Sequence, residues 1–340
     1  MNKVSQQQAS VYQSIGLLPA QLEQGWQQTA EADWPVGYKN FRNVVICGMG
    51  GSNIGYDLVR HVLGDQIKVP IILRPDYTLP GFVNKQTLVV LASYSGNTAE
   101  VLSCANEVKQ KKLKGYVLSG GGKLAALHKQ GVPGLIWGDN FNPSKQPRWG
   151  LGYSIGAFLQ VLKKAKLVSL ADKKFLQANQ TLADDQAIAK LGKAVAGKAL
   201  LLVGAEHLIG NAHILANQVN ETAKQLAWWL TLPDLNHHWL EALQVPRAVI
   251  KQYLQVIFLN SSNYSEEIQK RIRLTQNILS RQKVAWAEMT VTGDSLLHDS
   301  FSTLQSGSYL CYHISVANKV DPIAIPWVDE FKKALSSKAT

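Results

Sequence analysis

Short apolar runs alternate with amphipathic stretches from about residue 43 onward. Helical periodicity fills the intervals between several of these runs, and a longer helix is expected near 151–166. Strands of a sheet that is buried on both faces form continuous Val/Ile/Leu runs, so the pattern predicts a parallel sheet flanked by helices. The predicted strands are NVVICG (43–48), VPIILR (69–74), TLVVLA (87–92), GYVLSG (115–120) and GLIW (134–137).

The second half of the chain repeats this alternation. Strands are predicted over 198–206, 253–262 and 283–291, and a long helix is predicted over 211–229. The fold class is therefore α/β with two units, which suggests an internal duplication. The predicted organisation is an N-terminal helical extension (1–40), a first α/β unit (41–166), a helical connector (167–197) and a second α/β unit (198–340).

Composition narrows the class of protein. The 340 residues carry a formal net charge of +11, but the basic residues are scattered instead of gathered on one arm. A diffuse positive field favours small anionic substrates over nucleic acid. The polar N-terminus resembles no secretory signal, and no apolar run is long enough for a membrane span. Cys47, Cys104 and Cys311 form no CxxC pair, so a reducing, cytoplasmic setting is expected.

A glycine-rich loop, CGMGGSNIGYD (47–57), follows the first predicted strand. It fails the dinucleotide fingerprint because Asn53 replaces the third glycine, and it fails the P-loop pattern because Tyr56 replaces the lysine. Gly50, Gly51 and Ser52 remain at a predicted helix start, where backbone N–H groups can bind an anion. A tight turn with Ser52 as the N-cap explains this loop equally well.

The stretch LASYSGNTAEV (91–101) follows another predicted strand and carries more hydroxyl groups than a helix cap needs. Asn97 and Glu100 resemble a capping box, which does not explain the hydroxyl groups of Ser93, Ser95 and Thr98. Ligands of open α/β sheets bind at the carboxyl ends of the strands. These three hydroxyls are therefore predicted to bind a phosphate.

The two loops GMGGS (48–52) and SYSGNT (93–98) resemble those of the sugar isomerase (SIS) domain, a flavodoxin-like fold that binds phosphosugars. Over roughly residues 40–335 the chain resembles the bifunctional phosphoglucose/phosphomannose isomerases, which contain two SIS-type subdomains. The resemblance implies aldose–ketose isomerisation of hexose 6-phosphates through a cis-enediolate, without a metal or cofactor. The segments that carry it are PRWGLGYS (147–154), NETAKQ (220–225), LNH (235–237) and VDPIAIPWVDEFKKAL (320–335).

Two residues are candidates for the proton transfer itself. Glu221 lies in a polar stripe of the predicted helix 211–229, where a solvated Glu–Lys pair is the simpler interpretation. The resemblance instead implies that Glu221 is the proton-transfer base. Arg148 could be an ordinary surface arginine, but the resemblance implies that it stabilises the enediolate, a task that suits a permanently charged guanidinium.

Ring opening is assigned by the resemblance to His237 and Lys332. His237 and His238 are adjacent and lack further metal ligands, so a zinc site is not expected. The resemblance implies that His237 enters the site of a partner subunit, and hence a homodimer. Lys332 matches the pattern V-D-x-F-K, with Lys333 as the alternative one position further on.

Two alternatives concern the substrate and the class of protein. Ile323 stands where the family often has a threonine linked to mannose phosphate, which favours glucose 6-phosphate and fructose 6-phosphate as substrates. A non-catalytic SIS regulator would keep both phosphate loops but would not need the glutamate, histidine and lysine. The presence of all three favours an enzyme.

Overall fold

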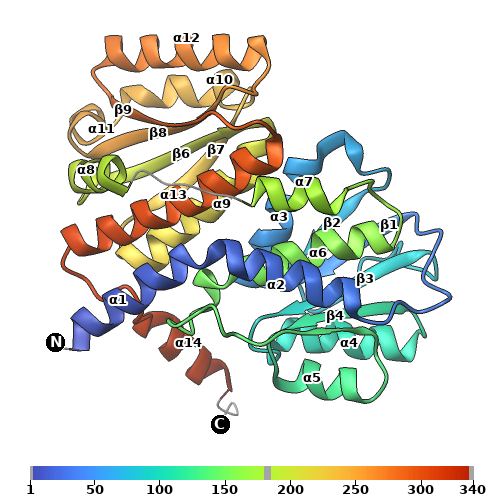
Figure 1. Ribbon diagram of the computed structural model, residues 1–340. Coiled ribbons are helices and arrows are strands. Elements are labelled where there is room, and N and C mark those ends of the chain that lie inside the picture. Colours follow the sequence, from blue (N-terminus) through green and yellow to red (C-terminus); the bar gives the residue numbers. More distant parts are fainter. Residues whose placement is uncertain (1–2, 180–184, 337–340) are drawn as a thin grey trace.

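The computed structural model describes residues 3–179 and 185–336, with the side chains of residues 3–5, 52 and 336 outside that description (Figure 1). The chain forms two parallel sheets, one in its N-terminal half and one in its C-terminal half. The first has five strands in the order β2-β1-β3-β4-β5, so the predicted parallel sheet is confirmed. The strands are β1 (Asn43–Cys47), β2 (Ile71–Arg74), β3 (Thr87–Ser93), β4 (Lys114–Ser119) and β5 (Gly134–Ile136).

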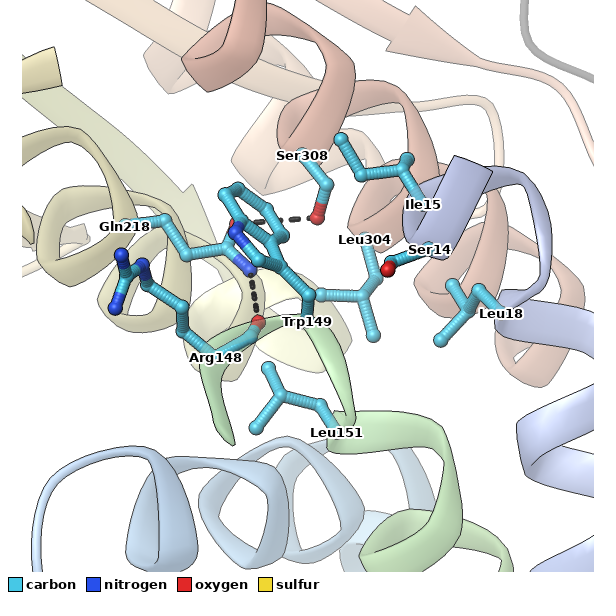
Figure 2. A pocket seen from close by; sticks show the side chains of 9 residues that line it. All are labelled: Ser14, Ile15, Leu18, Arg148, Trp149, Leu151, Gln218, Leu304 and Ser308. Carbon is cyan, nitrogen blue, oxygen red and sulfur yellow. Dashed lines mark hydrogen bonds between the residues drawn. The ribbon is translucent and has the colours of Figure 1, made fainter. Parts of the chain in front are cut away.

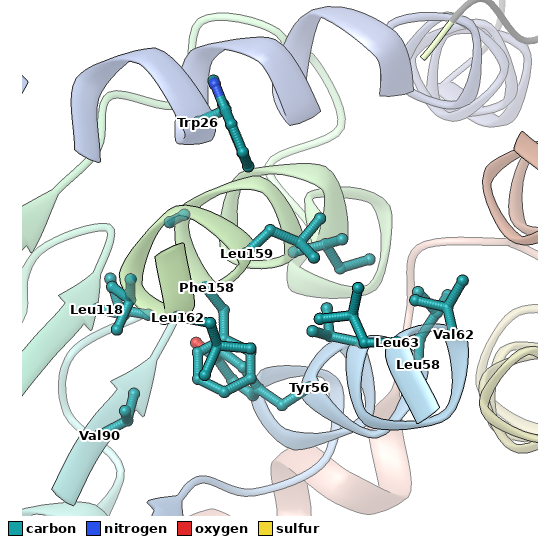
Figure 3. Packing of buried hydrophobic residues seen from close by; sticks show 14 of the residues in the cluster. Trp26, Tyr56, Leu58, Val62, Leu63, Val90, Leu118, Phe158, Leu159 and Leu162 are labelled. Carbon is teal, nitrogen blue, oxygen red and sulfur yellow. The ribbon is translucent and has the colours of Figure 1, made fainter. Parts of the chain in front are cut away.

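Helices cover both faces of the first sheet because alternate strand residues enter two separate cores. Val45 and Val89 pack with α4 and α5, whereas Val44 and Val90 pack with α3 and α6. Figure 3 shows the second of these cores between α3, α6 and the strands, with Tyr56 and Phe158 at its centre. The helices are α3 (Gly51–Leu63), α4 (Ala99–Gln110), α5 (Gly122–Lys129) and α6 (Leu151–Lys164).

The N-terminal helix α2 (Leu18–Glu31) packs onto this unit, whereas Val11 and Ile15 of the preceding helix α1 (Lys3–Gly16) enter the core of the second half. Helices α2 and α6 approach closely through glycines on both sides. A Cβ on Gly25 would lie 2.2 Å from the Tyr153 carbonyl oxygen, and a Cβ on Gly156 would lie 2.0 Å from that of Leu22. The close approach brings the segment before α6, which carries Arg148, against the N-terminal helices.

The second sheet has four parallel strands in the order β7-β6-β8-β9. Helices α9 and α13 lie on one face, and α10 and α12 lie on the other (Figure 1). Helix α13 joins the halves, because Phe301 enters the first core and Leu310 enters the second. The strands are β6 (Ala199–Ala205), β7 (Ala227–Leu232), β8 (Leu254–Ser261) and β9 (Ala285–Val291). The helices are α7 (Asp172–Ala178), α8 (Asp185–Val195), α9 (Ile209–Gln218), α10 (Leu235–His238), α11 (Arg247–Tyr253), α12 (Glu266–Gln282), α13 (Leu296–Ala317) and α14 (Pro326–Ser336).

The predicted long helix over 211–229 is wrong in its last third. Helix α9 passes into a wide π-helical turn, η4 (Val219–Ala223), and Lys224 then adopts a left-handed conformation with φ of 52°. Asn220 fixes the next segment, since its side chain accepts from the N–H of Ala227 and donates to the carbonyl of the same residue. Residues 227–232, rich in Trp, Leu and Thr, form strand β7 instead of more helix.

Candidate active site

The candidate site lies where the carboxyl ends of the first sheet face the turn η4 of the second half. Strands β1 and β3 are neighbours, and the helices that follow them, α3 and α4, cover opposite faces of the sheet. A crevice forms at such a switch in strand order. The two predicted phosphate loops therefore meet at one point of the sheet.

The SYSGNT loop is held together by its own hydroxyls. Ser93 is 1% exposed, accepts a hydrogen bond from the N–H of Gly96 at 3.0 Å and lies 2.8 Å from the Thr98 hydroxyl. Gly96 has φ of 71°, and a Cβ there would lie 1.8 Å from the Gly121 carbonyl oxygen. Ser95 is exposed. Ser93 thus builds the loop, while Ser95 and Thr98 remain on its rim.

The expected capping box at Asn97 and Glu100 is wrong. Thr98 is the N-cap of α4 and makes no side-chain capping bond among the described residues. The Asn97 side chain instead accepts from the N–H of Lys123, at 3.1 Å, and so caps the neighbouring helix α5. Because no side chain of the described chain fills its N-terminus, the first turn of α4 keeps N–H groups that can bind an anion.

The GMGGS loop lies at the same edge of the sheet, where Gly51 and Ser93 line one small cavity. Gly50 has φ of 51° and is the N-cap of α3, so the interpretation of Ser52 as the N-cap is wrong. Ser52 lies in the first turn of α3, and its side chain is outside the described part of the chain. A Cβ on Gly51 would lie 3.8 Å from the backbone nitrogen of Arg148, so this loop approaches the candidate arginine.

Arg148 lies in a short 3-10 turn, η2 (Pro147–Trp149), and is 3% exposed, so it is not a surface arginine. Its Nη1 donates to Gln146 Oε1 at 3.2 Å and to Glu221 Oε1 at 3.3 Å. Its Nη2 donates to the carbonyls of Pro322 and Ile323, at 2.7 and 2.8 Å. Burial lowers the pKa of Arg148, and the negative charge of Glu221 opposes that shift. The guanidinium is held from two sides.

Glu221 lies in the turn η4, and its side chain is 37% exposed. One carboxylate oxygen contacts Arg148, and part of the carboxylate remains open to solvent. The alternative interpretation, a solvated Glu–Lys pair, is not what the structure shows, since the Lys224 Nζ donates to the backbone carbonyl of Glu221. The structure thus brings together two of the predicted site residues from different halves of the chain.

Gln218 is a residue of this site that sequence reasoning missed. Its Nε2 donates to the Arg148 carbonyl at 3.0 Å, and its Oε1 accepts from Ser308 at 3.1 Å (Figure 2). A cavity of about 10 Å³ lies beside this pair, and Figure 2 shows the side chains that line it, including that of Trp149. Gln218 immediately precedes η4, so it ties the turn that carries Glu221 to the turn that carries Arg148.

His237 lies away from these residues in the same chain. Glu221 precedes strand β7, whereas His237 follows it in α10. A strand of six residues spans about 20 Å, so the two side chains are at opposite ends of the second sheet. Helix α10 packs against α12, with the Asn236 amide donating to Thr275 at 2.8 Å. His237 is exposed, and His238 Nε2 lies 3.3 Å from Asp234 Oδ2.

Lys332 is exposed on α14. This helix passes near the site: burial lowers the pKa of Arg148, and the negative charge of Asp329, one turn before Lys332, is among the charges that oppose this shift. Among the described residues there is no group of three or more His, Cys, Asp or Glu that could hold a metal ion. Nor does the described chain contain a helix long and apolar enough to cross a membrane.

Comparisons with known proteins show what the chain as a whole is similar to. Residues 184–335 match the family model of the bacterial phospho-glucose isomerase C-terminal SIS domain. A bifunctional phosphoglucose/phosphomannose isomerase from Caldicellulosiruptor bescii is 26% identical and covers 96% of this chain and 99% of its own. One from Thermoplasma acidophilum is 29% identical and covers 87% of this chain and 90% of its own. The resemblance seen in the motifs is confirmed: over most of its length the chain is similar to bifunctional phosphoglucose/phosphomannose isomerases.

The fold of this chain is shared with solved structures of lower sequence identity. The C-terminal domain of glucosamine-fructose-6-phosphate aminotransferase from Francisella tularensis superposes with a TM-score of 0.70 at 14% identity, covering 92% of this chain and 96% of that domain. The predicted fold class, SIS-type units with parallel sheets flanked by helices, is confirmed.

Proposed function

We propose that this chain is an aldose–ketose isomerase of hexose 6-phosphates that interconverts glucose 6-phosphate and fructose 6-phosphate. The observation that carries the proposal is the contact between Arg148 and Glu221 beside the two phosphate loops. The names of the relatives support mannose 6-phosphate as a further substrate. Ile323, which lacks the hydroxyl of threonine, is the reason to expect slower turnover of that substrate.

The proposed chemistry follows from the charges of the site. The substrate phosphate binds at the first turn of α4 with Ser95 and Thr98, and Gly50, Gly51 and Ser52 border it. Glu221 takes the proton from C2 of the open-chain aldose, and the electron pair enters the cis-enediolate. Return of the proton to C1, with the hydroxyl proton passing from O2 to O1, gives the ketose, so the reaction has no net redox change. Arg148 stabilises the negative oxygen of the enediolate.

The sugar ring must open before this step, and we assign ring opening to His237 and Lys332. Because His237 lies at the far end of β7 from its own Glu221, we propose that it acts in the site of a second copy of the chain. An exposed apolar stripe on α14 supports association between copies. Trp327, Phe331 and Leu335 repeat at helical spacing and are 80%, 65% and 60% exposed.

We also propose a cellular compartment for the protein and a division of the chain into domains. Three free, buried cysteines fit a reducing cytoplasm. Units spanning 41–166 and 198–340, with a connector over 167–197, remain our proposed division of the chain. The family match begins at residue 184, inside that connector.

A coupled assay of the purified protein tests the proposed function. Fructose 6-phosphate and mannose 6-phosphate are each supplied, with and without EDTA, and formation of glucose 6-phosphate is followed. Turnover of fructose 6-phosphate that is unchanged by EDTA is expected. No turnover of either sugar would support a non-catalytic phosphosugar regulator, and loss of activity in EDTA would contradict the metal-free mechanism.

A further inference from the structure

The segment that precedes α14 lies directly on Arg148. Two consecutive carbonyl groups, those of Pro322 and Ile323, accept hydrogen bonds from the same guanidinium nitrogen, Nη2. In an extended chain, neighbouring carbonyls point to opposite sides. Their convergence on one nitrogen therefore requires a turn in the backbone at this point.

Asp321 makes that turn. Its Oδ1 accepts from the N–H of Ile323 at 2.8 Å and from the N–H of Ala324 at 3.3 Å. An aspartate that bonds the backbone two residues later forms an Asx turn. Pro322 has a fixed φ and no N–H, so it restricts the turn further. The conformation of both carbonyls is thus set by a residue for which the structure shows no direct bond to Arg148.

The turn matters because a buried guanidinium has few ways to remain ordered. Burying an arginine is costly unless its N–H groups are bonded. The Nη1 side of Arg148 is bonded to Gln146 and Glu221, and the Nη2 side depends on the turn. The negative charges of Glu221, Asp321 and Asp329 also favour the charged form of Arg148. Nε of Arg148 is buried without a hydrogen-bond partner in the described chain, so loss of the turn would leave Nη1 as the one bonded nitrogen of this guanidinium among the described contacts.

We propose that Asp321 is a positioning residue for Arg148: its side chain folds residues 321–324 so that two carbonyls fix Nη2 and keep Nη1 directed at Glu221. This inference rests on the proposed isomerase function, in which Arg148 must be held in place when charge develops on the substrate. A misplacement of about 1 Å in such a group can cost on the order of 100-fold in rate.

Two substitutions separate the turn from the charge. Asp321→Ala removes the acceptor and is expected to lower kcat about 10- to 100-fold with little change in KM. Asp321→Asn removes the charge but keeps an oxygen that accepts the same bonds, and should stay within about threefold of wild type. If Asp321→Ala does not fold, Asp321→Ser, a weaker acceptor, replaces it, with kcat between the two. Wild-type kcat in Asp321→Ala, or equal losses in the alanine and asparagine variants, would overturn the inference.

A double-mutant cycle shows whether Asp321 acts through Arg148. In an Arg148→Ala background, Asp321→Ala should cost almost nothing further, because the group that it positions is gone. If the fold-losses in kcat of the two single variants multiply in the double variant, Asp321 acts elsewhere, for example only on the stability of α14.

Chemical labelling tests the same contact without any enzyme activity. An arginine-selective dicarbonyl reagent is applied, and modification of Arg148 is followed by peptide mass spectrometry with exposed Arg273 as the internal control. Labelling of Arg148 should be faster in Asp321→Ala than in wild type and unchanged in Asp321→Asn. Equal labelling in all three proteins would overturn the positioning role. If labelling differs as expected but wild type turns over no sugar phosphate, the proposed function fails while the positioning stands.

Discussion

The guanidinium Nη1 of Arg148 lies 3.3 Å from Oε1 of Glu221, although 73 residues separate the two in the sequence. One partner is buried and the other remains partly open to solvent. A buried cation beside an accessible carboxylate is suited to hold negative charge on a substrate while the carboxylate exchanges a proton. The hydrogen bond from Gln218 Nε2 to the Arg148 carbonyl holds the turn that carries Glu221 against the turn that carries Arg148.

Replacing Glu221 with glutamine should remove the base while keeping its shape. The amide oxygen can still accept from Arg148, so the site should remain assembled. We expect kcat to fall by about 10³-fold, with binding of fructose 6-phosphate changed only a few-fold. Turnover assays give kcat, and titration calorimetry gives the Kd. Glu241→Gln, at an exposed position of the second half, is the matched control and should keep full activity. Wild-type turnover in Glu221→Gln would remove the mechanism.

The rim of the SYSGNT loop should contribute to binding and little to chemistry. Each of Ser95→Ala and Thr98→Val removes a hydroxyl near the N-terminus of α4, and we expect KM to rise about tenfold with kcat nearly unchanged, because a hydrogen bond to a charged group is lost. Steady-state kinetics and inhibition by inorganic phosphate measure this. Ser103→Ala, further along α4, is the control. An unchanged KM in both rim variants would place the phosphate elsewhere.

Sharing of His237 between subunits predicts complementation between two inactive variants. In a two-fold dimer of Glu221→Gln with His237→Ala, one of the two sites has both an intact glutamate and an intact histidine. Random exchange of subunits should therefore restore about a quarter of wild-type activity. The measurement is activity against time after the variants are mixed, with each variant alone as the control. If activity does not return although mixed dimers are shown to form, His237 does not act across the interface.

Asp299 should make the free energy of unfolding depend on pH in the acidic range. Burial alone would raise the pKa of Asp299, but the close contact with His207, whose Nε2 lies 3.3 Å from Asp299 Oδ2, and hydrogen bonds from Ser261, Asn263 and the N–H of Gly293 lower it to about 2. A depressed pKa means that the stabilisation is complete above about pH 4 and is lost as pH falls toward 2. We expect Asp299→Asn to lower the free energy of unfolding by about 2 kcal/mol at pH 7.

Urea unfolding of wild type and Asp299→Asn over a pH series measures this effect. The difference between the two proteins should shrink as pH falls from about 4 toward 2, because the wild-type carboxyl then takes up a proton. Asp294→Asn, at an exposed position nearby, is the control and should show no such trend. A difference that stays constant with pH would show that the ionised carboxylate is not the source of the stability.

Local patterns were sufficient for much of the fold. The apolar runs at 43–48 and 87–92 became β1 and β3, because strands buried on both faces need continuous apolar residues. The two phosphate loops were recognisable because glycine and hydroxyl residues gather at strand ends. Periodicity failed at Ala227–Leu232, where Asn220 and the left-handed Lys224 redirect the chain into an edge strand.

The sequence by itself determined the α/β alternation, the loops and the family resemblance, since each of these is written in residues close together along the chain. Only the tertiary structure decided which polar groups meet. Asn97 caps α5 instead of α4, Arg148 is buried against Glu221, and His237 stands at the far end of β7. The bond from the N–H of Lys123 to Asn97 and that from Arg148 to Glu221 join residues 26 and 73 positions apart. Local periodicity carries no information about such pairs, and the packing of the two sheets supplies it.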